Sequence, residues 1–170
     1  RNGLGAIILF AVGNEGHYGD DATFKQINNE RQVITVAAST NDGRRAFFSS
    51  RGNSILVNAP SGGRNYYYPT KLDVPGIFTA MRNGQCIANF SGTSASTPMV
   101  SGVVALILSA NPKLSWRDVQ IILAMTSTVN DPTCSSWHKN AAGFYYSPYY
   151  GFGRVNAGKA TKLAKSWENV

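Results

Sequence analysis

The chain has 170 residues, of which 43% are hydrophobic and 15% are charged, a globular composition within the usual size of one domain. Its formal net charge is +7, but the basic residues are scattered from Arg1 to Lys165 without forming a run. This excludes nucleic acid as an expected partner, because nucleic-acid-binding proteins gather basic residues on a helix or stripe. No apolar run approaches the ~18 residues that span a bilayer, so no membrane span is expected.

The first predicted element is a strand over residues 6–12, which are all apolar. Such an unbroken run is typical of a strand buried on both faces of a parallel sheet. It leads into Gly13-Asn14-Glu15-Gly16, and ligands bind at the carboxyl ends of parallel strands. The side-chain amide of Asn14 can donate a hydrogen bond to an oxyanion there. The alternative is a turn residue that tolerates a positive φ.

Three more β elements are predicted before residue 91. Two are buried strands, and the third is a hairpin around Asn83-Gly84, a pair typical of a two-residue type I′ turn. The strands are expected at residues 33–38 and 54–59, a surface loop at residues 61–68, and the hairpin arms at residues 76–81 and 86–90.

The most informative segment follows at residues 89–103, which read Asn-Phe-Ser-Gly-Thr-Ser-Ala-Ser-Thr-Pro-Met-Val-Ser-Gly-Val. It predicts a buried helix that carries Ser94 on its first turn and ends near Ala110. Gly92 permits a tight turn into the serine, and Pro98 is tolerated in the first turn, where its missing N–H costs little. Because a helix N-terminus stabilises negative charge, Ser94 is a candidate nucleophile for acyl transfer. The alternative is a plain serine N-cap.

Two further helices complete the pattern. One begins at Ser115, where Asp118 three residues later resembles a capping box. The last helix is expected at residues 157–167, after an irregular aromatic stretch at residues 133–150. The apolar face of the first of these helices consists of Val119, Ile122 and Leu123. Strands that alternate with helices predict an α/β fold with a doubly wound, mostly parallel sheet and helices on both faces.

Gly-Thr-Ser94-Ala-Ser-Thr-Pro98, with Ala-Val-Gly-Asn14-Glu-Gly upstream, resembles the subtilisin-like serine peptidases. The segments at residues 111–120, 150–157 and 166–170 narrow this resemblance to the kexin and furin branch, and it covers nearly the whole chain. The resemblance implies that Ser94 is the nucleophile and that Asn14 completes the oxyanion hole.

The resemblance also indicates which part of such an enzyme this chain represents. In the subtilisin order the triad aspartate and histidine precede the asparagine and the serine, but only residues 1–13 precede Asn14. His17 and His138 do not lie where the family places its base, so both are expected to be surface or loop residues. Residues 1–170 are therefore expected to form the C-terminal half of a subtilase catalytic domain. The N-terminal half, with Asp and His, would be a partner outside this chain. A P domain would follow the C-terminal end of this chain.

The function implied by this resemblance is serine endopeptidase activity on peptide or protein substrates, with a secreted or extracytoplasmic location. The substrate-binding residues implied are Ala11, Val12, Gly13, Gly92 and Thr93, the first three forming one wall of the P1 pocket with their backbone. The rival from another class is a non-catalytic subtilase-like binding or assembly module, which needs no upstream Asp and His. An unrelated serine hydrolase is disfavoured because Gly-x-Ser-x-Gly is absent.

The family resemblance further implies Ca²⁺ as a cofactor, with Asp20 as a ligand. Calcium takes roughly 6–8 oxygen ligands, and Asp20 with Asp21 supplies too few. Ser50 stands where the family has a glutamate ligand, and Lys25 stands where it has an aspartate at the floor of the P1 pocket. Strict cleavage after arginine is therefore not carried over to this chain.

The two cysteines leave several pairings open. The resemblance implies that Cys86 is bonded to a cysteine of the upstream half. Cys134 is either free or the partner of Cys86, and two reduced thiols are the remaining alternative. The sequon at Asn89-Phe-Ser91 is expected to be unmodified, because a glycan beside the serine turn would obstruct a substrate.

Overall fold

The computed structural model describes residues 1–62 and 75–170. At its centre is a three-stranded parallel sheet in the order β1-β2-β3. The strands are β1 (Ile8–Ala11), β2 (Val33–Ser39) and β3 (Ile55–Pro60). The positions of all three predicted strands are confirmed, with differences of one or two residues at their ends. The expectation that the first strand is buried on both faces is wrong, because β1 lies at the edge of the described sheet and its Ile8 and Phe10 are each 41% exposed. Most of the surface loop predicted at residues 61–68 lies outside the described residues.

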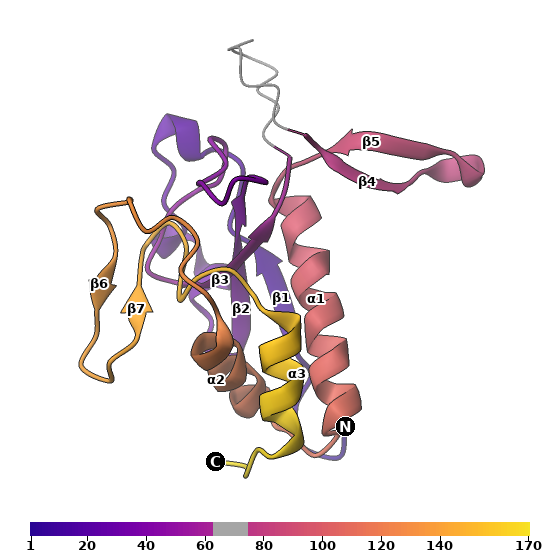
Figure 1. The fold of residues 1–170 in the computed structure, drawn as a ribbon, viewed down its shortest axis with the longest axis vertical. Helices are drawn as coiled ribbons and strands as arrows, with labels where there is room; N and C mark the ends of the chain where they lie inside the picture. The colour runs from indigo at the N-terminus through magenta and orange to yellow at the C-terminus, as the bar shows by residue number, and fades with distance from the viewer. Residues whose placement is uncertain (63–74) are drawn as a thin grey trace.

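Helices lie on both faces of the sheet, but the two faces differ in what covers them. The three α-helices pack on one face (Figure 1), and the short 3₁₀ helices cover part of the other. The α-helices are α1 (Thr93–Ala110), α2 (Trp116–Thr126) and α3 (Ala157–Lys165). The 3₁₀ helices before β2 are η1 (Gly16–Tyr18), η2 (Ala22–Phe24) and η3 (Gln26–Asn29), and a fourth, η4 (Arg82–Gly84), lies farther along the chain.

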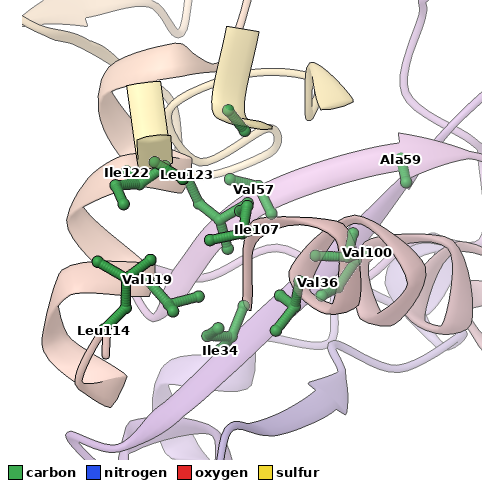
Figure 2. Close-up of a cluster of buried hydrophobic side chains, with 13 residues drawn as sticks. Ile34, Val36, Val57, Ala59, Val100, Ile107, Leu114, Val119, Ile122 and Leu123 are labelled. Carbon is green, nitrogen blue, oxygen red and sulfur yellow. The ribbon is translucent and has the colours of Figure 1, made fainter. Parts of the chain in front are cut away.

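The main core lies between the sheet and the α-helices (Figure 2). Alternate side chains of β2 and β3 point into it, as the period of a strand requires. Its fully buried members include Ile34, Val36, Val57, Ala59, Val100, Ile107, Leu114, Val119, Ile122 and Leu123. Each large aliphatic side chain in this group stabilises the fold by about 1.5–3 kcal/mol through burial. The predicted apolar face of α2 is thus confirmed. A smaller cluster on the opposite face contains Val12, Ala22, Ala37 and Ile55.

Helix α1 is only half-buried, in contrast to the buried helix predicted from its sequence. Val100 and Ile107 are fully buried, whereas Leu106 is 52% exposed on the opposite side. Within the described part of the chain, α1 alone has the length and apolar character to cross a membrane, with 18 residues and a mean hydropathy of 1.4. Because it packs on all three strands and on α3, it is a core helix with one uncovered face.

The hairpin of β4 (Ile77–Ala80) and β5 (Cys86–Phe90) projects from the body of the molecule (Figure 1). Asn83 and Gly84 both have the positive φ expected for a type I′ turn. However, the Met81 N–H donates to the Gln85 carbonyl at 2.7 Å, so three residues form the loop. The predicted two-residue turn is wrong because Arg82 also leaves the strand ladder.

Both cysteines are free in this structure. Cys86 is exposed at the start of β5, and Cys134 is partly buried in the tail. The alternative in which they pair with each other is therefore not realised. The pairing of Cys86 with an upstream half stays a prediction.

The tail contains more regular structure than predicted. A short antiparallel pair, β6 (His138–Lys139) and β7 (Tyr145–Tyr146), lies within the stretch expected to be irregular. Helix α3 begins after its N-cap Asn156 and ends at Lys165, two residues before the predicted end. Trp167 leaves the helix because its indole N–H donates to Asp118 at 3.0 Å.

The buried carboxylate of Asp118 joins α2 to the end of the chain. One oxygen accepts hydrogen bonds from the Trp167 indole and the Val170 N–H, both at 3.0 Å. The other accepts from the Ser115 N–H at 2.7 Å and completes the predicted capping box. Burial alone raises the pKa of Asp118, but the hydrogen bonds from Ser115, Val170 and Trp167 outweigh it and lower the pKa below its usual value.

We expect Asp118→Asn to destabilise the full-length protein by about 2–3 kcal/mol, because its NH₂ group would face an N–H donor that the carboxylate accepts. A carboxyl whose folded pKa is depressed contributes stability above its unfolded pKa of about 3.9 and loses it as the pH falls through the folded pKa. The variant should therefore lose less stability than the wild type between about pH 5 and pH 3. Urea unfolding across this range checks both effects, with the exposed Glu168→Gln as control. Parallel pH curves for wild type and Asp118→Asn would contradict the assignment.

Candidate active site

Ser94 lies on the first turn of α1 with its side chain exposed to solvent. The turn before it depends on Gly92, which has φ +93° and forms the N-cap without a side chain, a conformation that favours glycine. The Ala95 N–H donates to the Gly92 carbonyl at 2.9 Å. No hydrogen bond to a described residue involves the Ser94 N–H, as is usual for the first N–H groups of a helix.

Two buried serines hold this turn against the end of β3. The Ser61 hydroxyl donates to the Gly92 carbonyl at 2.9 Å, and the Ser96 hydroxyl donates to the Ala59 carbonyl at 3.0 Å. Both residues are almost completely buried. Sequence reasoning missed them, because serine is common near helix starts and only the position of β3 reveals their partners.

Asn14 follows the carboxyl end of β1 and reaches the same turn. Its Oδ1 accepts hydrogen bonds from the Thr93 N–H at 2.8 Å and the Thr93 hydroxyl at 2.9 Å. A backbone N–H is a donor only, so the oxygen of the amide must face Thr93 and Nδ2 must face away. Nδ2 donates to no described residue. Two segments far apart in sequence therefore bring a free side-chain N–H₂ beside the start of the serine helix.

This arrangement can stabilise negative charge. Backbone N–H groups at a helix N-terminus and an asparagine amide are donors of the kind that form oxyanion holes. The positive end of the α1 dipole lies at the same place. The site is thus chemically suited to an oxyanion formed when Ser94 Oγ attacks a carbonyl group.

Hydrogen bonds from neighbouring segments fix the backbone of residues 11–13, which is predicted to form one wall of the P1 pocket. The Ala11 carbonyl accepts a hydrogen bond from Asn28 Nδ2 at 3.2 Å, and the Gly13 carbonyl accepts one from the Ser50 N–H at 3.0 Å. The side chain of Val12 is fully buried. The Val12 side chain is therefore not available to a substrate.

The two histidines lie in surface segments, as predicted. His17 is exposed in η1, with its ring 3.9 Å from that of Tyr18 and 5.6 Å from that of Phe47. His138 is exposed on β6 beside Tyr146. Among the described residues, none forms a hydrogen bond with Ser94 Oγ. In this structure Ser94 Oγ therefore has no hydrogen-bonded base among the described residues.

The predicted calcium ligand Asp20 already has a cationic partner. Lys25 Nζ lies 2.5 Å from Asp20 Oδ2 and 3.9 Å from Glu15 Oε2. Burial alone raises the pKa of Asp20, but the hydrogen bond from Lys25 helps to bring it below its usual value. Ser50 Oγ is buried and meets no acceptor at hydrogen-bond geometry, although it lies close enough to Asp20 to help lower that pKa. In the described ranges, no three His, Cys, Asp or Glu side chains converge on one point. These residues do not fit a calcium ion.

Comparison with known protein families identifies the origin of this site. Residues 1–153 match the Subtilase family. The chain belongs to the subtilase family. Both segments of the site, the asparagine turn after β1 and the serine turn of α1, lie within the matched region of this subtilase.

Relatives of this subtilase include processing proteases. It is 37% identical over 172 residues to the dibasic-processing endoprotease of Schizosaccharomyces pombe, and 35% identical over 170 residues to human proprotein convertase subtilisin/kexin type 5. Each alignment covers 100% of this chain, but only 23% and 9% of the respective relatives.

A solved structure shows the same fold. The crystal structure of the serine protease of Aeromonas sobria matches with a TM-score of 0.87 and 26% identity, over 98% of this chain and 38% of that chain. The subtilase therefore has the α/β subtilisin-like fold that its sequence predicts. It spans well under half the length of each of these proteins.

Proposed function

We propose that this subtilase chain is the serine-bearing part of a subtilisin/kexin-type serine endopeptidase. The observation that carries the proposal is the meeting of Asn14 with the Ser94 turn. Asn14 Nδ2 and the Ser94 N–H have no acceptor within the described residues, so both are available to an oxyanion. The relatives named as endoproteases support the same class of reaction.

In the proposed reaction, Ser94 Oγ attacks the carbonyl carbon of the scissile peptide bond. The electron pair of the carbonyl moves to its oxygen, and the Ser94 N–H and Asn14 Nδ2 donate hydrogen bonds to that oxyanion. A histidine from outside this chain takes the hydroxyl proton and passes it to the leaving amine, and an aspartate orients that histidine. Water then hydrolyses the acyl-enzyme on Ser94.

An uncovered surface of the described chain supports the proposal that a partner supplies this histidine. Strand β1 is an edge strand, and its Ile8 and Phe10 are each 41% exposed. Beside it, a hollow of about 450 Å³ lies between the strand and α1, lined by residues that include Leu9 and Ala105. An uncovered edge strand next to an uncovered apolar helix face is unfavourable in water. We assign this surface to the N-terminal half of the catalytic domain, which brings Asp and His.

Location and neighbouring domain are part of the same proposal. A secreted or extracytoplasmic protein is supported by the resemblance to kexin-type enzymes and by an exposed cysteine, Cys86, that suits a disulfide in an oxidising compartment. The same resemblance leads us to expect a P domain after residue 170.

Labelling with a fluorophosphonate probe tests the proposed function in the full-length protein. Mapping should place the phosphonyl group on Ser94, and Ser94→Ala should abolish the modification. If the folded full-length protein takes up no probe, the endopeptidase proposal fails, and the non-catalytic binding or assembly module becomes the better account. That module would need no aspartate and histidine upstream of residue 1.

A further inference from the structure

The ammonium group of Lys25 is surrounded by oxygen atoms close to the turn that contains Asn14. Its Nζ donates hydrogen bonds to Asp20 Oδ2 at 2.5 Å and to the Val12 carbonyl at 3.2 Å, and it lies 3.9 Å from Glu15 Oε2. An ammonium group has three donors, and here it meets three oxygens from three residues. The Lys25 side chain is 33% exposed, so its charged end is partly withdrawn from water.

The backbone at Gly13 leaves room for this ammonium group. Gly13 has φ +113°, and a Cβ added there would lie 2.5 Å from Lys25 Nζ. Any other residue would therefore displace the ammonium group as well as strain the backbone. Gly13 therefore both permits the backbone turn and leaves space for the Lys25 ammonium group.

Two of these oxygens belong to residues that contact Asn14 or lie just before it. Glu15 Oε2 accepts a hydrogen bond from the Asn14 N–H at 2.9 Å, and the Val12 carbonyl belongs to the segment that leads to Asn14. Lys25 therefore joins the segment around Asn14 to Asp20 and to the start of η3. Without the ammonium group, the Asp20 carboxylate would lose the cation that hydrogen-bonds to it and would keep the like charge of Asp21 beside it.

We propose that the Lys25 ammonium group is the built-in cation of this turn and replaces calcium there. A metal ion and the ammonium group compete for the same oxygens, and the lysine is covalently attached and needs no supply from solution. Hard cations such as calcium also need more oxygen ligands than Asp20, Glu15 and one carbonyl provide. This inference does not rest on the proposed function, because it concerns the fold of the turn alone.

The first test counts calcium. The full-length wild type, Asp20→Asn and the exposed control Glu168→Gln are dialysed against calcium, freed of excess metal and measured by elemental analysis. We expect equal calcium content per molecule in all three, whatever other sites the full-length protein holds. One calcium fewer in Asp20→Asn alone would overturn the proposal.

The second test asks whether the charge of Lys25 stabilises the protein through Asp20. In EDTA, Lys25→Met should lower the Tm of the full-length protein by about 2–4 °C, whereas Lys162→Met on the exposed face of α3 should not. In the Asp20→Asn background, Lys25→Met should cost much less, because the carboxylate that needs the cation is gone. An unchanged Tm for Lys25→Met, or equal losses in both backgrounds, would show that the ammonium group has no such role.

Discussion

Ser94→Ala should lower the kcat of the full-length protein for peptide hydrolysis by a factor on the order of 10⁶, the loss seen for the corresponding serine of subtilisin. The nucleophilic oxygen would be absent, and neither the oxyanion donors nor bound water can replace it. The fold should be unaffected, because the Ser94 side chain is exposed and Oγ makes no hydrogen bond to a described residue. Hydrolysis of a fluorogenic peptide and thermal unfolding of the same preparations check both statements.

Ser109→Ala is the matched control for this experiment. Ser109 is an exposed serine on the last turn of the same helix, so its loss changes the helix in the same chemical way at a place far along its axis. The control should retain wild-type kcat. Hydrolysis by Ser94→Ala at the wild-type rate would place the nucleophile elsewhere and remove the central claim of the proposed function.

Asn14→Asp should lower kcat by about 10²–10³-fold with little change in KM, because a donor to the oxyanion is replaced by a negative charge. This substitution separates the two roles of the residue. A carboxylate still accepts the hydrogen bonds that Thr93 donates to Asn14 Oδ1, so the turn should keep its shape. Steady-state kinetics with a fluorogenic peptide measures the effect, and thermal unfolding checks that the turn is intact.

Asn41→Asp adds the same charge at an exposed turn residue and serves as the control for net charge. It should have the kinetic constants of the wild type. A wild-type kcat for Asn14→Asp would limit Asn14 to holding Thr93 in place. A raised KM with unchanged kcat would instead indicate a role in binding the substrate before the chemical step.

Local signals in the sequence were sufficient for most secondary structure. The strand predicted at residues 33–38 follows from a stretch rich in Val, Ile and Thr, and the start of α2 follows from Ser115 and Asp118, which form the predicted capping box. Interactions of this kind involve neighbours along the chain, so the residue pattern determines them. One error occurred where a distant contact competes, at the end of α3, where the Trp167 indole donates to Asp118. Another was local, at the hairpin, where Arg82 joins Asn83 and Gly84 in a three-residue loop.

For the candidate site, too, some features follow from local sequence and others from contacts between distant segments. The sequence by itself determined which residue types carry the chemistry, because the serine motif and the asparagine turn are contiguous patterns with recognisable neighbours. Only the tertiary structure decided that Asn14 meets Thr93, that Ser61 and Ser96 hold the serine turn, and that Lys25 pairs with Asp20. Each of these contacts joins separate parts of the fold through a hydrogen bond or ion pair, and such partners are set by how β1, β3 and α1 pack rather than by residues adjacent in the chain.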